Sequence, residues 1–106
     1  MDRKTFVTEA DRTLADLERR IADLELEQLE PDLAGDVLTL EFADGTKFII
    51  NAHSAARQIW MAAGTEAWHF DYDAERDAWI ASKNGDELYD AVRRVLSDKL
   101  GFSVDV

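Results

Sequence analysis

The sequence predicts an α+β fold: a two-layer α/β sandwich in which an N-terminal and a C-terminal helix pack on one face of an antiparallel sheet of about five strands. Apolar residues recur at helical spacing near both ends of the chain. Between them, short runs alternate apolar and polar residues and are separated by turn residues. Two helices bury their apolar stripes by covering the same sheet face. We expect a single domain, residues 1–106.

The first helix is expected over residues 3–27. Its buried stripe, at steps of three or four residues, consists of Phe6, Ala10, Leu14, Leu17, Ile21 and Leu24. Pro31 makes a longer helix unfavourable, and Gly35 marks a turn. We therefore expect a loop between this helix and the first strand.

The middle of the chain is predicted to form strands. Residues 37–42 and 46–51 flank an Asp-Gly turn, which tolerates the positive φ of tight hairpins. Residues 57–63 fit a helix or a strand by periodicity, and their short length favours a strand. Residues 67–72 and 77–82 are predicted to form another hairpin, with Trp68 and Trp79 in the core.

The second helix is expected over residues 85–100. Acidic residues stand in its first turns, where negative charge is favourable, and Gly101 suits the position after its last turn. The tail, residues 102–106, either packs on the domain or frays.

Composition and charge restrict the function classes. The net charge of −11 disfavours nucleic acids and anionic membranes and favours cations or a basic patch on a partner protein. The absence of cysteine excludes thiolate catalysis and thiolate-bound metal. No run approaches the about 20 apolar residues of a membrane span, and the N-terminus has no apolar signal region. A cytoplasmic location is therefore expected.

The segment from Asp23 to Asp36 concentrates negative charge where the first helix should end. It holds six carboxylates and no Lys, Arg or His. Carboxylates at a helix C-terminus are unfavourable by about 0.3–1 kcal/mol each. From the residues alone, a solvated acidic face is favoured over a binding surface. If the helix reaches residue 27, Asp23 and Glu27 lie one turn apart and can share a hard cation.

The order of elements resembles the frataxin family, in particular its short bacterial CyaY branch. The resemblance covers nearly the whole chain and depends mainly on GDVLTLEFADGTKFIIN (35–51), RQIW (57–60), WHFD (68–71) and DAW (77–79). It implies a small acidic protein of iron–sulfur cluster assembly. Frataxins bind ferrous and ferric iron weakly through surface carboxylates, and they dock on the cysteine desulfurase and its scaffold protein.

The resemblance also implies site residues. Six acidic residues fall where the bacterial pattern carries an acidic ridge, the name kept below for this set: Glu18, Asp23, Glu25, Glu27, Glu30 and Asp32. Arg19 and Ala22 depart from that pattern, which makes the ridge thinner on the helix. With the resemblance, weak iron binding here is favoured over a merely solvated face. Other divalent cations suit the same oxygen ligands.

A second candidate surface surrounds Trp60. From sequence alone Trp60 is either a core residue or an exposed aromatic contact. The resemblance implies that the scaffold side of the assembly complex contacts this surface, with Asn51, Gln58 and His69 nearby. His69 is expected to face outwards, either as an ordinary strand residue or as an auxiliary contact. Neither His53 nor His69 has a second ligand at the spacing of a closed metal site.

Three function classes remain. The first is an iron-binding regulator or iron donor of iron–sulfur cluster assembly, monomeric without metal. The second is a metal-independent acidic module that mimics nucleic acid and occupies a basic partner protein. The third is a non-specific buffer of divalent ions. No nucleophile motif and no phosphate-binding glycine loop is present, so no enzymatic activity is expected.

Overall fold

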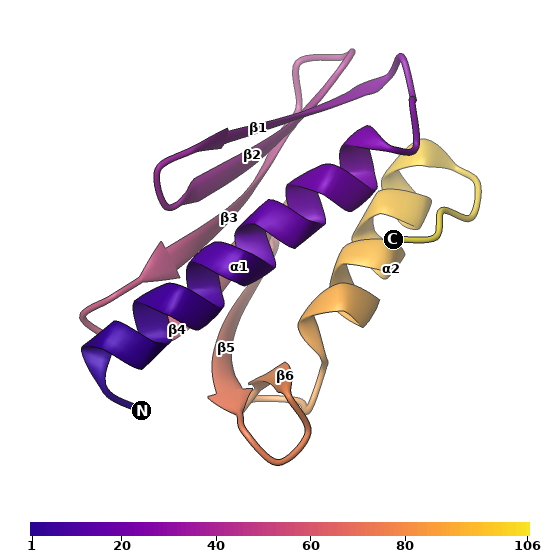
Figure 1. The fold of residues 1–106 in the computed structure, drawn as a ribbon. Helices are drawn as coiled ribbons and strands as arrows, with labels where there is room; N and C mark the ends of the chain where they lie inside the picture. Colours follow the sequence, from indigo (N-terminus) through magenta and orange to yellow (C-terminus); the bar gives the residue numbers. More distant parts are fainter.

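A computed structural model describes all residues, 1–106. The elements, in chain order, are α1 (Arg3–Ala22), β1 (Leu29–Ala34), β2 (Val37–Phe42), β3 (Lys47–His53), β4 (Gln58–Ala63), β5 (Glu66–Asp73), β6 (Ala78–Ala81) and α2 (Leu88–Leu100). The strands form one antiparallel sheet in the order of the sequence. Both helices lie on one face of this sheet, which confirms the predicted fold class (Figure 1).

The prediction was wrong about the region between α1 and β2. The sheet has six strands instead of about five, because residues 29–34 form β1 where a loop was expected. The helix ends at Ala22 instead of residue 27, and the Asp23 N–H bonds to the Arg19 carbonyl. Glu25 then takes the left-handed conformation, with φ of 52°, and turns the chain back. Pro31 is tolerated because β1 is an edge strand.

The other strand predictions are confirmed. β2 and β3 form the expected hairpin, with Gly45 at φ of 88° in its turn. Residues 58–63 are a strand, and β5 and β6 form the second hairpin. Leu38, Leu40 and Phe42 of β2 are buried towards the helices. The other face of the sheet carries no helix and is called the open face below.

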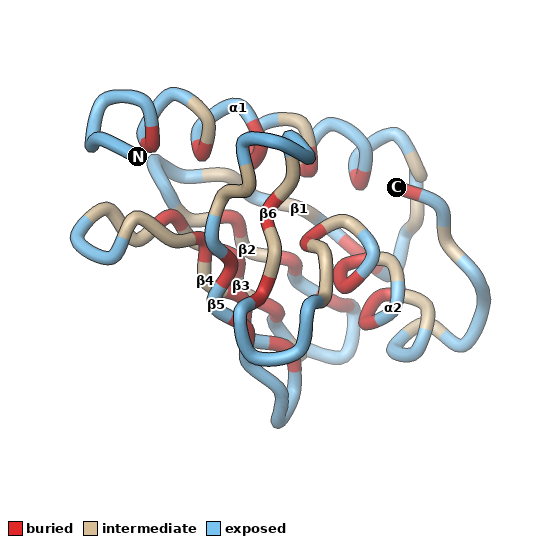
Figure 2. The backbone as a smooth tube through the Cα atoms, turned by 90° about the horizontal axis from the view of Figure 1, so that it is seen from below, coloured by how far each residue is buried: buried red, intermediate tan, exposed pale blue.

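The core lies between the helices and the sheet (Figure 2). Trp68 and Trp79 are 4% and 2% exposed, as predicted. The Trp79 indole N–H donates to the Thr13 hydroxyl at 3.0 Å, and the Phe6 ring meets Trp79 edge-on. These contacts fix α1 against β6.

Helix α2 begins three residues later than predicted. The Glu87 side chain accepts hydrogen bonds from the N–H groups of Tyr89 and Asp90, which makes Glu87 the N-cap. Gly101 ends the helix in the left-handed conformation, as expected. Neither helix is both long enough and apolar enough to cross a bilayer.

Candidate functional site

The acidic ridge follows one side of the molecule from α1 to the sheet edge. Glu18 lies on α1, and Asp23 follows the last residue of that helix. Glu25 and Glu27 lie in the connection, and Glu30 and Asp32 lie on β1. All of them are exposed except Glu18, which is half-buried.

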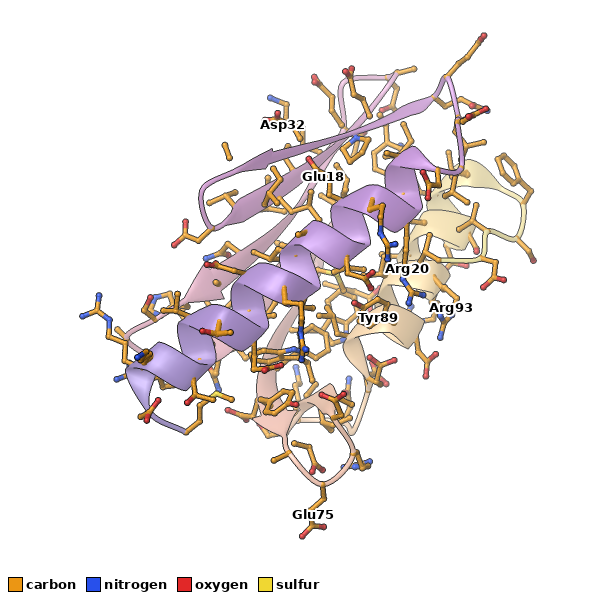
Figure 3. The ribbon with its side chains drawn as sticks, viewed as in Figure 1. Glu18, Arg20, Asp32, Glu75, Tyr89 and Arg93 are labelled. Carbon is orange, nitrogen blue, oxygen red and sulfur yellow. The ribbon has the colours of Figure 1, made fainter.

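Glu18 links the two parts of the ridge. Its carboxylate accepts a hydrogen bond from the Leu33 backbone N–H at 3.2 Å, across the gap between α1 and β1. Figure 3 shows Glu18 projecting from α1 on the side of β1, where Asp32 is placed. One oxygen of Glu18 is therefore occupied by the fold, so this residue has a structural role beside any role in binding.

The sheet adds an acidic residue that sequence reasoning missed. Glu30 lies directly opposite Glu41 of β2, and Glu41 lies opposite Lys47 of β3. Glu41 is exposed on the open face. The alternation of β2 already placed Glu41 on that face, but only the register of β1 brings it beside the ridge.

The structure does not gather the ridge into one metal cage. Asp23 and Glu27 were predicted to share a helical turn, and this is wrong because α1 ends before them. No group of three or more His, Cys, Asp or Glu side chains is placed to hold one ion. Separate exposed carboxylates bind hard cations weakly and leave them largely hydrated.

The nearby arginines do not neutralise the ridge. Arg19 and Arg20 both pair with Asp16, which lies on the side of α1 that faces α2. Arg20 also stacks over the Tyr89 ring at 5.1 Å (Figure 3). Burial opposes ionisation of Asp16, but hydrogen bonds from Tyr89 and Arg19 outweigh it and lower the pKa of Asp16. The positive charge at the end of α1 is thus drawn towards α2.

The second candidate surface lies on the open face. Asn51, Trp60 and His69 stand side by side on β3, β4 and β5. Trp60 is half-buried, which resolves the choice between core and open face in favour of the open face. Its indole N–H donates to Gln58 at 2.8 Å, and the Gln58 amide donates to Asp71 at 3.1 Å.

Trp60 is held between two histidines. The His53 ring comes from β3 and the His69 ring from β5, and both stack on the Trp60 indole between them. Their ring centroids lie 4.0 Å and 4.3 Å from that of the indole, and their planes are tilted by 16° and 13° against it. We call His53, Trp60 and His69 the histidine–tryptophan stack. Both faces of the Trp60 indole are covered, so only its edge is exposed on the open face.

His53 was missed as a site residue. The signal available was its position two residues after Asn51, which places both on the same face of β3. Its contact with Trp60 depends on the register between β3 and β4, where His53 lies opposite Gln58. The His53 Nδ1 atom is buried and has no hydrogen-bond partner.

A cavity of about 290 Å³ lies between α1, α2 and β6. Its polar groups already satisfy one another: the Tyr89 hydroxyl donates to Asp16 at 2.7 Å, and the Tyr72 hydroxyl donates to Asp77. The bond to Asp77 raises the pKa of Tyr72 to about 12. These two hydrogen bonds link α2 to α1 and β5 to the start of β6.

Comparison with known proteins identifies relatives over almost the full length. The family model described as "Frataxin-like domain" matches residues 1–102. The "Iron-sulfur cluster assembly protein CyaY" of Thioalkalivibrio sulfidiphilus is 43% identical over 101 residues, covering 94% of each chain. Its namesake in Paraburkholderia phymatum is 35% identical over 107 residues, covering 100% of this chain and 98% of the relative.

A solved structure supports the same relationship. The frataxin of Psychromonas ingrahamii superposes with a TM-score of 0.89 at 30% identity, covering 99% of this chain and 97% of that one. The overall fold is therefore shared with a chain that has only 30% sequence identity.

Proposed function

Because the chain belongs to the frataxin-like family, we propose that it serves iron–sulfur cluster assembly as an iron-binding regulator or iron donor. It docks through the acidic ridge on the complex of a cysteine desulfurase and an iron–sulfur scaffold protein. The observation that carries this proposal is the ridge itself: exposed carboxylates without a basic neighbour, since Arg19 and Arg20 turn to Asp16.

The ridge suits a basic groove on the partner. The chain carries a net charge of −11, and this charge attracts a positive surface at long range. Such attraction is screened over about 10 Å at 0.1 M salt, so the association rate should fall steeply as salt rises. A surface of this kind sets encounter and orientation more than it sets lifetime.

Iron is the cargo that fits the ridge chemically. Carboxylate oxygens are hard ligands that accept Fe²⁺ and, more favourably, Fe³⁺. Since the carboxylates stand apart, binding is weak and other divalent cations compete. Weak binding suits a protein that gives up its metal or senses its level.

The open face supplies a second contact. Asn51, Gln58, Trp60 and His69 contact the scaffold protein, and the histidine–tryptophan stack presents them as a flat surface. Aromatic rings that are already immobilised lose little conformational freedom on binding. Charge at the ridge and shape at the stack then orient the partner from two sides.

The docking test is a charge reversal with a matched control. Asp23, Glu25, Glu27 and Glu30 are changed together to Lys, and the control changes the exposed Asp11, Glu75, Asp98 and Asp105 to Lys. Both variants alter the net charge equally. Affinity for the desulfurase–scaffold complex at low salt should fall strongly for the ridge variant and less for the control. An equal loss of affinity in both variants would mean that net charge, and not the position of the ridge, determines docking.

Iron binding needs its own measurement. Anaerobic calorimetry with Fe²⁺ should give weak heats for the native chain and smaller heats for the ridge variant. Equal heats for both would mean that the ridge does not bind iron.

The absence of a compact ligand group also favours the alternative, a metal-independent acidic module that mimics nucleic acid. Recovery of a nucleic-acid-binding protein and no desulfurase from native lysate would support that alternative.

A further inference from the structure

The outward backbone N–H groups of the edge strand β1 are all satisfied or absent. The two-residue turn Gly35–Asp36 makes Ala34 and Val37 the hydrogen-bonded closing pair of the β1–β2 hairpin. The backbone N–H and C=O groups of every second residue of β1, counted from Leu33, therefore point away from β2. The first two are Leu33, whose N–H bonds to Glu18 at 3.2 Å, and Pro31, which has no N–H. Next comes Leu29, whose N–H bonds to Leu26 at 3.3 Å. This edge offers no free donor.

The opposite side of the sheet is covered only in part. Strand β6 is short and pairs with Phe70–Asp73 of β5. The outer edge of β6 is met by the chain before α2: the Ala81 N–H bonds to Asp86 at 2.8 Å, and Ile80 bridges to Glu87. The first half of β5, Glu66–His69, has no strand beyond it.

The direction of the backbone groups in this half-strand follows from its hairpin. The turn Gly64–Thr65 has two residues, so Ala63 and Glu66 form the hydrogen-bonded closing pair. By alternation, the N–H and C=O groups of Ala67 and His69 point away from β4. The N–H groups of Ala67 and His69 donate no hydrogen bond. Unpaired edge groups of this kind are the template for strand addition.

A cavity lies directly against this free edge. Its volume is about 290 Å³, and its lining comes from β5 (Ala67–His69), from Ala81 at the end of β6 and from the turn Ser82–Asn84. The space therefore continues the line of β6 past the point where that strand stops. On the open face beside it, the exposed His69 ring stacks on Trp60 on one side only.

We propose that the free edge at Ala67 and His69 accepts an extended segment of the assembly partner as an additional strand. The proposal rests on the function proposed above. The segment pairs with the outward backbone groups, and a planar side chain opposite His69 continues the histidine–tryptophan stack. Cross-strand neighbours of this type are spaced for such contact, and main-chain pairing is a common mode of peptide recognition.

The occupant is a partner protein and not a second copy of this chain. Two copies, each with a net charge of −11, repel one another. The turn Ser82–Asn84 also lines the cavity at this edge.

Hydrogen exchange at single-residue resolution tests the pairing. On binding the desulfurase–scaffold complex, the amides of Ala67 and His69 should exchange about tenfold more slowly or better, whereas Trp68, already bonded to β4, should change little. Binding without slower exchange at Ala67 and His69 overturns strand addition and leaves the proposed function standing. No binding at all overturns the proposed function instead. Slowing that depends on concentration, without partner, overturns the partner assignment in favour of a second copy.

A pair of variants gives an independent readout. Ala67→Pro removes an outward N–H that has no partner in the fold, a position where an edge strand tolerates proline. Ala67→Val keeps that N–H and serves as the control. Affinity should fall about fivefold or more for the proline variant, the equivalent of one lost hydrogen bond, and change little for the valine variant. Equal affinities overturn the proposal, and the exchange experiment decides if the proline variant does not fold.

Discussion

Glu18 offers a test of the ridge as a structural feature, separate from binding. Its carboxylate accepts the Leu33 N–H at 3.2 Å and so ties α1 to the edge strand β1. Glu18→Ala removes the acceptor and leaves that N–H without a partner in a half-buried position. Glu18→Gln removes the charge and keeps an acceptor oxygen. The two variants therefore separate hydrogen bonding from charge.

The expected magnitude follows from the type of bond. Hydrogen bonds to charged groups contribute about 1.5–3 kcal/mol when well shielded, and the half-exposed position of Glu18 reduces this to about 1 kcal/mol. For a domain of this size, that loss lowers Tm by about 4 °C. Glu18→Gln should lose less than half as much. Glu27→Ala, which removes an exposed carboxylate with no hydrogen bond, should stay within about 0.5 kcal/mol.

Urea unfolding followed by circular dichroism measures all three variants. Equal destabilisation by Glu18→Ala and Glu18→Gln would refute the reasoning, because it would mean that charge and not hydrogen bonding matters. A Glu18→Ala variant as stable as the native chain would refute it as well, since β1 would then be held without this bond.

Three further predictions concern separate parts of the fold. The hydrogen bond from Lys99 lowers the pKa of Asp44 from its ordinary value to about 2, so its stabilising effect is present above pH 4 and is lost as pH falls to about 2. Asp44→Asn should therefore flatten the pH dependence of stability in that window, and an unchanged slope would contradict this. Thr13→Ala leaves the buried Trp79 N–H without an acceptor and should cost about 1–3 kcal/mol in denaturant unfolding, with Thr13→Ser as the control that keeps the hydroxyl. His53→Ala should shift the indole N–H resonance of the tryptophan in the stack, whereas His53→Phe should restore much of the stacking; equal shifts would mean that the ring contact is unimportant.

Much of the fold was predictable because its signals are local. The Asp-Gly turn between β2 and β3 and the acidic start and glycine end of α2 each depend on a few adjacent residues. Strand β1 was not predictable in this way. It is short, it contains Pro31, and its acidic residues suggest a loop. It forms because Leu29 lies opposite Phe42 and Leu33 opposite Leu38, and sequence alone does not supply that register.

The candidate site shows the same limit. Strand alternation was enough to turn His69 outwards on β5, but it left Trp60 undecided between the core and the open face. The register of β4 against β5 sets Trp60 beside His69. The contribution of His53 depends on how β3 is registered against β4, and the position of Glu41 beside Glu30 depends on β1. The pairing of Asp23 with Glu27 failed because it assumed a helix that ends earlier. Interactions between elements, not within them, account for what was missed.

The most direct test of the central claim is the rate of iron–sulfur cluster formation on the scaffold protein, measured with the desulfurase, cysteine and Fe²⁺. The native chain should change that rate at low salt. The variant with Lys at positions 23, 25, 27 and 30 should lose most of this effect, whereas the control with Lys at positions 11, 75, 98 and 105 should retain most of it. An effect of equal size from the native chain and the ridge variant would contradict the account.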